Sequence, residues 1–331
     1  MPAFAPSEGP AVDDLSPEIA QDLYADAVAL KRGELWWVVP ELLLCLGGIT
    51  ALVVSPRLVG SVLFGVTGAL AHLTSWTIDG YQLLTTDAVT YYRNHRRAEQ
   101  AQAAASSAHR ARLKATPLTV TWGLLALIAL VTLVELALAG PARAVGVAGL
   151  VKPLVRQGEW WRILTHSYLH VGAQHAVGNL GALIILGQLI EAYDRRHRVP
   201  LVYLAGVVAG GLSSVAILRA SSVGASAGVL ALAGYLLVVF YRERGPHGAW
   251  LRQRVARFVA MTAVIGILGM FAIDNAAHAG GFLAGVVTGL VTVPRLGDTP
   301  HPRTLQAVDV LSVMAAAILV AGGVATAWLL V

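Results

Sequence analysis

A serine between glycines is the first residue of this sequence whose type and setting could do chemistry. Ser226 lies in the run GASAG, with Gly224 two residues before it and Gly228 two after it. Glycines allow close backbone approach and leave a hydroxyl accessible. Small polar residues also pack helices together in membranes, and Ser226 taken alone is more typical of that packing role. A serine becomes a nucleophile only when an adjacent base takes its proton, so the chemistry depends on a suitably placed histidine.

His278 opens the run HAGGFLAG and is the predicted base. Gly281 and Gly285 follow it by three and seven residues, so all three lie on one helical stripe. Small residues on that stripe let the helix pack closely against another small-residue helix. The GxxxG around Ser226 is the predicted partner, and such packing predicts that the imidazole meets the serine hydroxyl. The alternative is a buried histidine that binds a backbone carbonyl.

A third cluster, in the run HSYLHVGAQHAVGN, supplies candidate donors. His175 and Asn179 are four residues apart and share a helical face. Attack on a carbonyl creates an oxyanion that needs preorganised donors, and these two side chains with the backbone N–H of Ser226 are the candidates. Asn179 has the alternative of bonding across helices only. His166 and His170 are predicted to support the loop or the start of the helix.

No acidic residue is predicted to orient the base. Asp274 and Asn275 precede His278 but are assigned to a loop, so a Ser-His dyad is predicted rather than a triad.

A metal or haem site is the rival for the histidines. His170, His175 and His278 would be its ligands, but no HExxH motif is present and Ser226 would have no role. We therefore predict no metal and no organic cofactor.

Composition indicates that these residues are held by membrane helices. The chain has 331 residues, of which 56% are hydrophobic and only 13% charged, about half the charge of a soluble protein. The apolar residues form long runs, which predicts an all-α polytopic transmembrane bundle. The basic residues lie between these runs rather than on one face, which argues against nucleic acid as a partner. The acidic N-terminus lacks the basic start of a cleavable signal peptide.

Nine apolar runs are predicted to span the membrane. They lie at about 36–54, 58–76, 117–139, 170–192, 200–218, 226–241, 255–273, 276–293 and 307–330. With a cytoplasmic N-terminus, 18 of the 24 Lys and Arg residues fall on the inner side. This positive-inside bias predicts a multi-pass protein of the cell membrane.

The runs divide the chain into five predicted segments. They are a polar cytoplasmic tail (1–35), a transmembrane hairpin (36–76), a basic cytoplasmic helix or linker (77–116), the core (117–293), and a linker with a last transmembrane helix (294–331).

The motifs resemble those of the rhomboid intramembrane serine proteases over roughly 117–293. The matching positions are Trp161-Arg162, then His170, His175 and Asn179, then Glu191, then Gly224-Ala225-Ser226, and last His278, Gly281 and Gly285. Two positions depart from the family pattern. Ala227 stands where a glycine commonly follows the serine, and Leu230 stands where an aromatic residue commonly packs against the histidine.

The resemblance implies a six-helix core, here with an N-terminal hairpin and an extra C-terminal helix. It also implies a cofactor-free endopeptidase that cuts single-pass transmembrane proteins near the outer membrane surface. Trp161, Arg162 and Glu191, together with His170 and the two glycines after His278, then have structural roles. The second hypothesis is a rhomboid-like protein that binds membrane clients without cutting them, which the departures at Ala227 and Leu230 favour.

Overall fold

A computed structural model describes residues 88–243, 246–269, 273–295 and 302–331, together with isolated residues between 16 and 25. The chain divides into two compact units, 1–107 and 108–331. The second unit holds every candidate site residue. The predicted hairpin at 36–76 lies outside the described residues.

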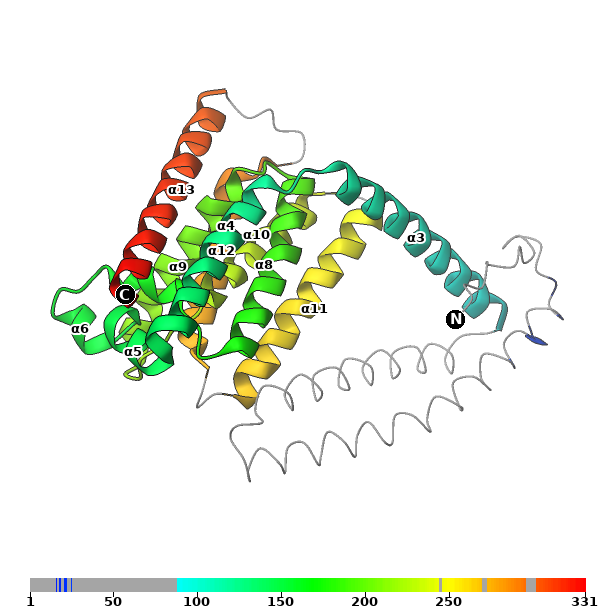
Figure 1. The fold of residues 1–331 in the computed structure, drawn as a ribbon. Coiled ribbons are helices and arrows are strands. Elements are labelled where there is room, and N and C mark those ends of the chain that lie inside the picture. Colours follow the sequence, from blue (N-terminus) through cyan, green and yellow to red (C-terminus); the bar gives the residue numbers. More distant parts are fainter. Residues whose placement is uncertain are drawn as a thin grey trace. The chain divides into compact units, whose positions relative to one another are not determined.

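The second unit is helical (Figure 1). Its helices are the end of α3 (Ala88–Ala115), α4 (Thr119–Val134), η3 (Glu135–Ala139), α5 (Gly140–Ala148), α6 (Lys152–Arg156), α7 (Arg162–Thr165), η4 (His166–Tyr168), α8 (Ala173–Tyr193), α9 (Arg198–Ile217), α10 (Ser226–Arg242), α11 (Pro246–Leu268), α12 (Asn275–Thr292) and α13 (Pro302–Leu330). The prediction of an all-α polytopic bundle is confirmed.

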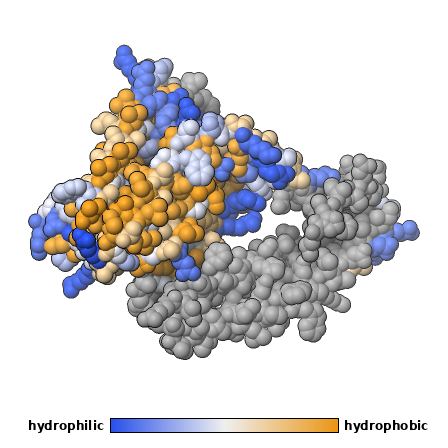
Figure 2. Space-filling model, in the orientation of Figure 1, coloured by the Kyte–Doolittle hydropathy of each residue, from blue (hydrophilic) through white to orange (hydrophobic). Residues whose placement is uncertain are grey.

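Four stretches of helix are long and apolar enough to cross a membrane, among the residues that the structure describes. They are Thr119–Ala148, in which α4, η3 and α5 are continuous, and the helices α8, α9 and α13. The apolar helix α10 is shorter. Hydrophobic side chains cover the middle of the bundle face in Figure 2, and hydrophilic ones gather toward its ends. The protein is therefore a multi-pass membrane protein.

Helix α11 begins earlier than the sequence indicates. It starts at Pro246, whereas the apolar run was predicted from 255. Arg252 and Arg254 precede the apolar run but belong to the helix, because arginine is a good helix former. Hydropathy therefore locates the apolar part of α11 and misses its charged first turns.

Helix α12 packs against both α9 and α10 through small residues. A Cβ added at Gly281 would collide with the backbone of Ala227, and one at Gly285 with the backbone of Ala231. The predicted partner helix, α10, is confirmed, but the predicted contact through the GxxxG of Gly224 and Gly228 is wrong. Gly228 instead faces the Tyr203 ring, because the helix turns its Ala227–Ala231 stripe toward α12.

Candidate active site

The serine and the histidine meet at the ends of two helices. Ser226 is the first residue of α10, and His278 lies in the first turn of α12. The His278 Nε2 atom lies 2.8 Å from the Ser226 Oγ atom, within hydrogen-bond distance. Because Gly281 brings the backbones of the two helices into contact, it also brings these two side chains together. A nucleophile paired with a base at this distance is suited to acyl transfer.

Gly224 shapes the turn that presents Ser226. Its φ of +139° is rarely adopted by residues with a side chain. Its N–H donates to the His166 carbonyl at 3.0 Å. A Cβ at this position would lie 2.8 Å from the ring of His175. Glycine is therefore required by the backbone conformation and by the adjacent imidazole.

His175 is the predicted oxyanion donor that the structure brings near the serine, since its ring lies against Gly224. Asn179 is buried, and its Nδ2 donates to the His175 carbonyl at 3.1 Å. Its amide thus supports the turn of α8 that carries His175. His170 packs its ring edge-to-face on His175, with the centroids 5.2 Å apart. The three residues form a layered support beside Ser226.

Glu135 fixes His170 from the other side and was missed by the sequence reasoning. Its Oε2 accepts from the His170 backbone N–H at 2.9 Å, and Thr132 Oγ1 lies 3.1 Å from His170 Nδ1. Glu135 is fully buried in the π-helical turn η3. The available signal was an acidic residue inside an apolar run. Such a residue is energetically costly in a membrane, so it usually has a specific structural or functional partner.

Asp274 lies just before α12, in the loop where the sequence placed it, but its role was missed, and Asn275 was wrongly assigned to that loop. Asp274 caps α12, since its Oδ1 accepts from the Ala277 N–H at 2.9 Å, and Asn275 is the first residue of that helix. Its Oδ2 lies 3.4 Å from the Lys152 ammonium and accepts from the Ser214 hydroxyl. A capping side chain fixes where a helix starts. Asp274 thereby fixes the first turn of α12, which carries His278.

Lys152 joins this cluster from α6 although its side chain is fully buried. Its ammonium donates to Ser222 Oγ at 2.7 Å, and Ser222 exchanges backbone hydrogen bonds with Leu150. The segment before Ser226, the start of α12 and α6 are thus held together by one buried ion pair and its hydrogen bonds.

The pKa values of this cluster follow from burial and partners. Burial by itself would raise the pKa of the Asp274 carboxyl, but hydrogen bonds from Ser214, Ser222 and the Ala277 N–H, with the charge of Lys152, lower it below its usual value. Burial lowers the pKa of Lys152 against the opposing effect of Asp274. Burial also lowers the pKa of His166 to about 4, so this imidazole is neutral at pH 7. Asp274 is therefore ionised at neutral pH.

Trp161 and Arg162 hold the segment before α8. The Arg162 guanidinium is buried and donates to Glu159, to the Gly149 carbonyl at 2.9 Å and to the Gly146 carbonyl at 3.0 Å. It also lies over the half-exposed Trp161 ring, 4.5 Å from its centroid. Neither side chain is placed at Ser226.

Glu191 lies at the far end of α8 from His175. Its Oε1 accepts from the Thr121 backbone N–H in the first turn of α4. Because that N–H has no partner within its own helix, the carboxylate joins α8 to α4.

Within the described ranges, no group of three or more His, Cys, Asp or Glu side chains is placed to bind a metal ion.

Comparison with known proteins places a family domain over this region. Residues 157–295 match the family model of the Rhomboid domain. Rhomboid-related protein 2 of Mus musculus is 46% identical over 95 residues, which are 28% of this chain and 32% of the relative. Rhomboid protease GluP of Bacillus subtilis (strain 168) is 33% identical over 135 residues, 40% of this chain and 26% of the relative. Inactive RHOMBOID-like protein 8 of Arabidopsis thaliana is 31% identical over 136 residues, 40% of this chain and 38% of the relative. The chain therefore spans well under half the length of each of these relatives.

Proposed function

The chain belongs to the rhomboid family, and from that membership we propose that it is an intramembrane serine endopeptidase with Ser226 and His278 as its catalytic dyad. The observation that carries the proposal is the 2.8 Å distance between His278 Nε2 and Ser226 Oγ, at the meeting point of α10 and α12. Family membership alone is insufficient support, because the relatives include an inactive member as well as a protease.

The mechanism follows from the roles that the two groups can fill. His278 Nε2 takes the Ser226 proton as Oγ attacks the scissile carbonyl carbon. The protonated imidazole then gives that proton to the leaving amine, which breaks the C–N bond and leaves an acyl-enzyme. Water, deprotonated by His278, releases the acyl group and restores the serine.

The oxyanion of each tetrahedral intermediate needs donors beside Ser226. The first N–H groups of α10 have no partner within their helix and are available. The imidazole of His175 lies next to Gly224 and is the candidate side-chain donor. Asn179 and His170 position that ring and do not themselves contact the reacting atoms in this proposal.

The proposed substrates are single-pass transmembrane proteins within the lipid bilayer, cut near the outer surface of the cell membrane. Ser226 begins an apolar helix of 17 residues, so it lies at one end of the bundle. The positive-inside bias supports placing that end outside and the N-terminus in the cytoplasm. Nucleic acid has no place in this proposal.

The proposal is tested with the purified full chain, a fluorophosphonate probe and a transmembrane substrate in liposomes. Ser226→Ala and His278→Ala are each expected to lower labelling and cleavage by at least about a thousandfold, because neither group works without the other. Ser221→Ala is the matched control, since this serine is exposed and five residues from the nucleophile, and it should retain wild-type rates. Labelling that persists in Ser226→Ala would sink the proposal.

A non-catalytic client-binding protein is the second candidate function. Leu230 is buried where the family commonly has an aromatic residue, and it leaves His278 without that stacking partner. This candidate takes the lead if folded wild type neither labels nor cleaves while a transmembrane client still co-purifies with it. Leu230→Tyr and Ala227→Gly would then be the first changes to test for restored labelling.

A further inference from the structure

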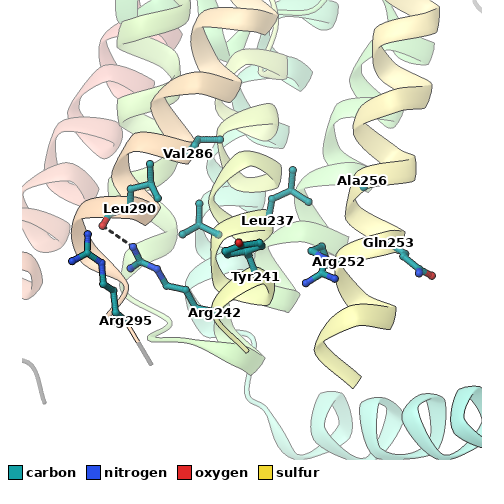
Figure 3. Close-up of a pocket in the computed structure, with 10 residues that line it drawn as sticks. Leu237, Tyr241, Arg242, Arg252, Gln253, Ala256, Val286, Leu290 and Arg295 are labelled. Atoms are coloured by element: carbon teal, nitrogen blue, oxygen red, sulfur yellow. Dashed lines mark hydrogen bonds between the residues drawn. The ribbon is translucent and has the colours of Figure 1, made fainter. Parts of the chain in front are cut away.

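A groove at the other end of α10 has no part in the proposed chemistry. Its volume is about 960 Å³, and it opens between α10, α11 and the end of α12 (Figure 3). Arg242 is 16 residues from Ser226 along α10, which corresponds to roughly 24 Å at 1.5 Å per residue. The groove is therefore a separate feature from the dyad.

One wall of the groove is apolar. It consists of Leu237 and Val238 of α10, Ala256 of α11, and Val286 and Leu290 of α12. Helix α11 packs against α10, and the space toward α12 stays open beside this wall. An apolar wall of this kind is suited to contact with a hydrocarbon chain.

Three arginines face the same groove. Arg242 ends α10, Arg252 lies on α11 and Arg295 follows α12, and none of the described residues that line the groove is acidic. Arg242 donates one N–H to the Leu290 carbonyl at 3.1 Å (Figure 3), while its other terminal nitrogen has no hydrogen-bond partner among the described residues. The Arg252 guanidinium lies over the Tyr241 ring, 5.9 Å from its centroid. Three positive charges therefore line the groove, and the described residues around it supply no carboxylate to neutralise them.

We propose that this groove binds an anionic phospholipid, with the phosphate held by Arg242, Arg252 and Arg295 and an acyl chain along the apolar wall. Guanidinium groups bind phosphate oxygens through paired, charge-assisted hydrogen bonds. Arginines at the ends of apolar helices lie at the depth of lipid headgroups, where anionic lipid attracts them. Free phosphate would satisfy the arginines but leave the apolar wall in water, so the two halves of the groove together favour a lipid.

Binding of a lipid here would join α11 to α10 and α12. Arg252, Gln253 and Ala256 belong to α11. The other lining side chains come from α10, from α12 and from Arg295 just after α12. The lipid would thus replace the protein contacts that are missing between α11 and the end of α12. This role is independent of whether Ser226 is catalytic.

The first test measures lipid binding to the full chain in detergent by native mass spectrometry. Phosphatidylglycerol is compared with phosphatidylcholine at equal concentrations, and inorganic phosphate is added as a competitor. The triple variant Arg242→Gln/Arg252→Gln/Arg295→Gln should lose at least about tenfold in phosphatidylglycerol affinity, since one arginine near an anionic lipid contributes about fivefold. Arg110→Gln/Arg196→Gln/Arg257→Gln is the matched control, because it removes three exposed arginines outside the groove.

A second variant separates the groove from a general charge effect. Ala256→Trp fills the apolar wall, keeps all three arginines, and lies at an exposed position that does not burden the core. It should also lower phosphatidylglycerol binding by about tenfold while the melting temperature stays close to wild type. Equal binding of the two lipids, equal losses in the triple variant and its control, or competition by phosphate alone would each overturn the proposal. Failure of any phospholipid to bind would overturn it as well.

Discussion

Helix α12 has different neighbours at its two ends. At the dyad end, which we define by Ser226 and His278, its backbone touches α10 at Ala227, and the buried charges Lys152 and Asp274 are paired. At the arginine end, defined by Arg242, Arg252 and Arg295, a groove of about 960 Å³ separates α12 from α11.

The difference predicts which parts of the bundle are fixed by several contacts and which by few. A shift of α12 at the dyad end would break an ion pair, a helix cap and close backbone packing together. Helix α11 is tied to the start of α12 by the Asn275 amide, which donates to the Gly266 carbonyl at 2.8 Å, and it diverges toward the arginine end. We therefore expect the dyad end to be the more rigid and α11 to be the helix that moves most easily.

The largest expected loss of stability comes from removing the cation at the dyad end. Lys152→Met leaves the largely buried Asp274 carboxylate without its partner, and we expect the free energy of unfolding to fall by about 3 kcal/mol. Dyad labelling should fall with it, since the start of α12 is no longer fixed. Chemical denaturation in detergent measures the first effect and a fluorophosphonate probe the second.

The double variant Lys152→Met/Asp274→Asn is the control for that experiment. It removes both charges, so it should recover at least half of the lost stability. A double variant no more stable than Lys152→Met would show that the lysine acts through packing and not through the ion pair.

The next largest loss of stability is expected from a substitution that disturbs the helix packing at the dyad end. Gly285→Ala places a methyl group against the Ala231 carbonyl and should cost about 2 kcal/mol. Gly123→Ala adds the same methyl group where nothing lies within 4 Å, and it should gain up to about 1 kcal/mol from better helix propensity. In denaturation experiments, a loss of stability in Gly285→Ala with a gain in Gly123→Ala would support the close packing at the dyad end. Small and equal changes in the two variants would contradict it.

Local spacing predicted the helices, and the small-residue stripe after His278 led to the prediction that this histidine lies beside Ser226, where the structure places it. Apolar runs locate α8, α9 and α10, and the stripe that begins at His278 shows which face of α12 is small. The loop position of Asp274 was predicted, but its contacts with Lys152 and Ser214 were not, because those residues lie far away in the chain. Spacing gives the face of a helix but not the residue opposite it, since that depends on the rotation of both helices in the bundle.

The contact between α10 and α12 illustrates that limit, because it was predicted at Gly224 and Gly228 and lies at Ala227 and Ala231. Ala227, noted as a departure from the family pattern, contacts α12 and lies where a Cβ on Gly210 of α9 would collide with its methyl group. A glycine across the interface thus leaves room for the alanine. Such compensation between distant positions is invisible when a motif is read alone.

The pH dependence of stability should report the Asp274 carboxyl. Its pKa is lower in the folded protein than the usual unfolded value of about 4, so its contribution is complete above that value. The contribution is lost as the pH falls through the folded pKa. The stability gap between wild type and Asp274→Asn, measured from pH 7 to pH 3, should therefore be constant down to about pH 4 and shrink below it. A gap that is unchanged at pH 3 would mean that the charge of Asp274 does not contribute.

The smallest expected loss of stability comes from removing the hydrogen bond between the start of α12 and α11. Asn275→Ala removes one hydrogen bond between α12 and α11, so the free energy of unfolding should fall by about 1 kcal/mol. Because the dyad geometry does not depend on that bond, fluorophosphonate labelling should stay at the wild-type rate. If α11 admits the substrate by moving, cleavage of a transmembrane substrate should rise about two- to threefold. Thr262→Val is the matched control, since the Thr262 hydroxyl donates to the Phe258 carbonyl within α11, and it should leave cleavage unchanged. Equal changes in labelling and cleavage would show that Asn275 acts on the geometry of Ser226 and His278. The dyad end would then depend on its contact with α11 as well as on α12.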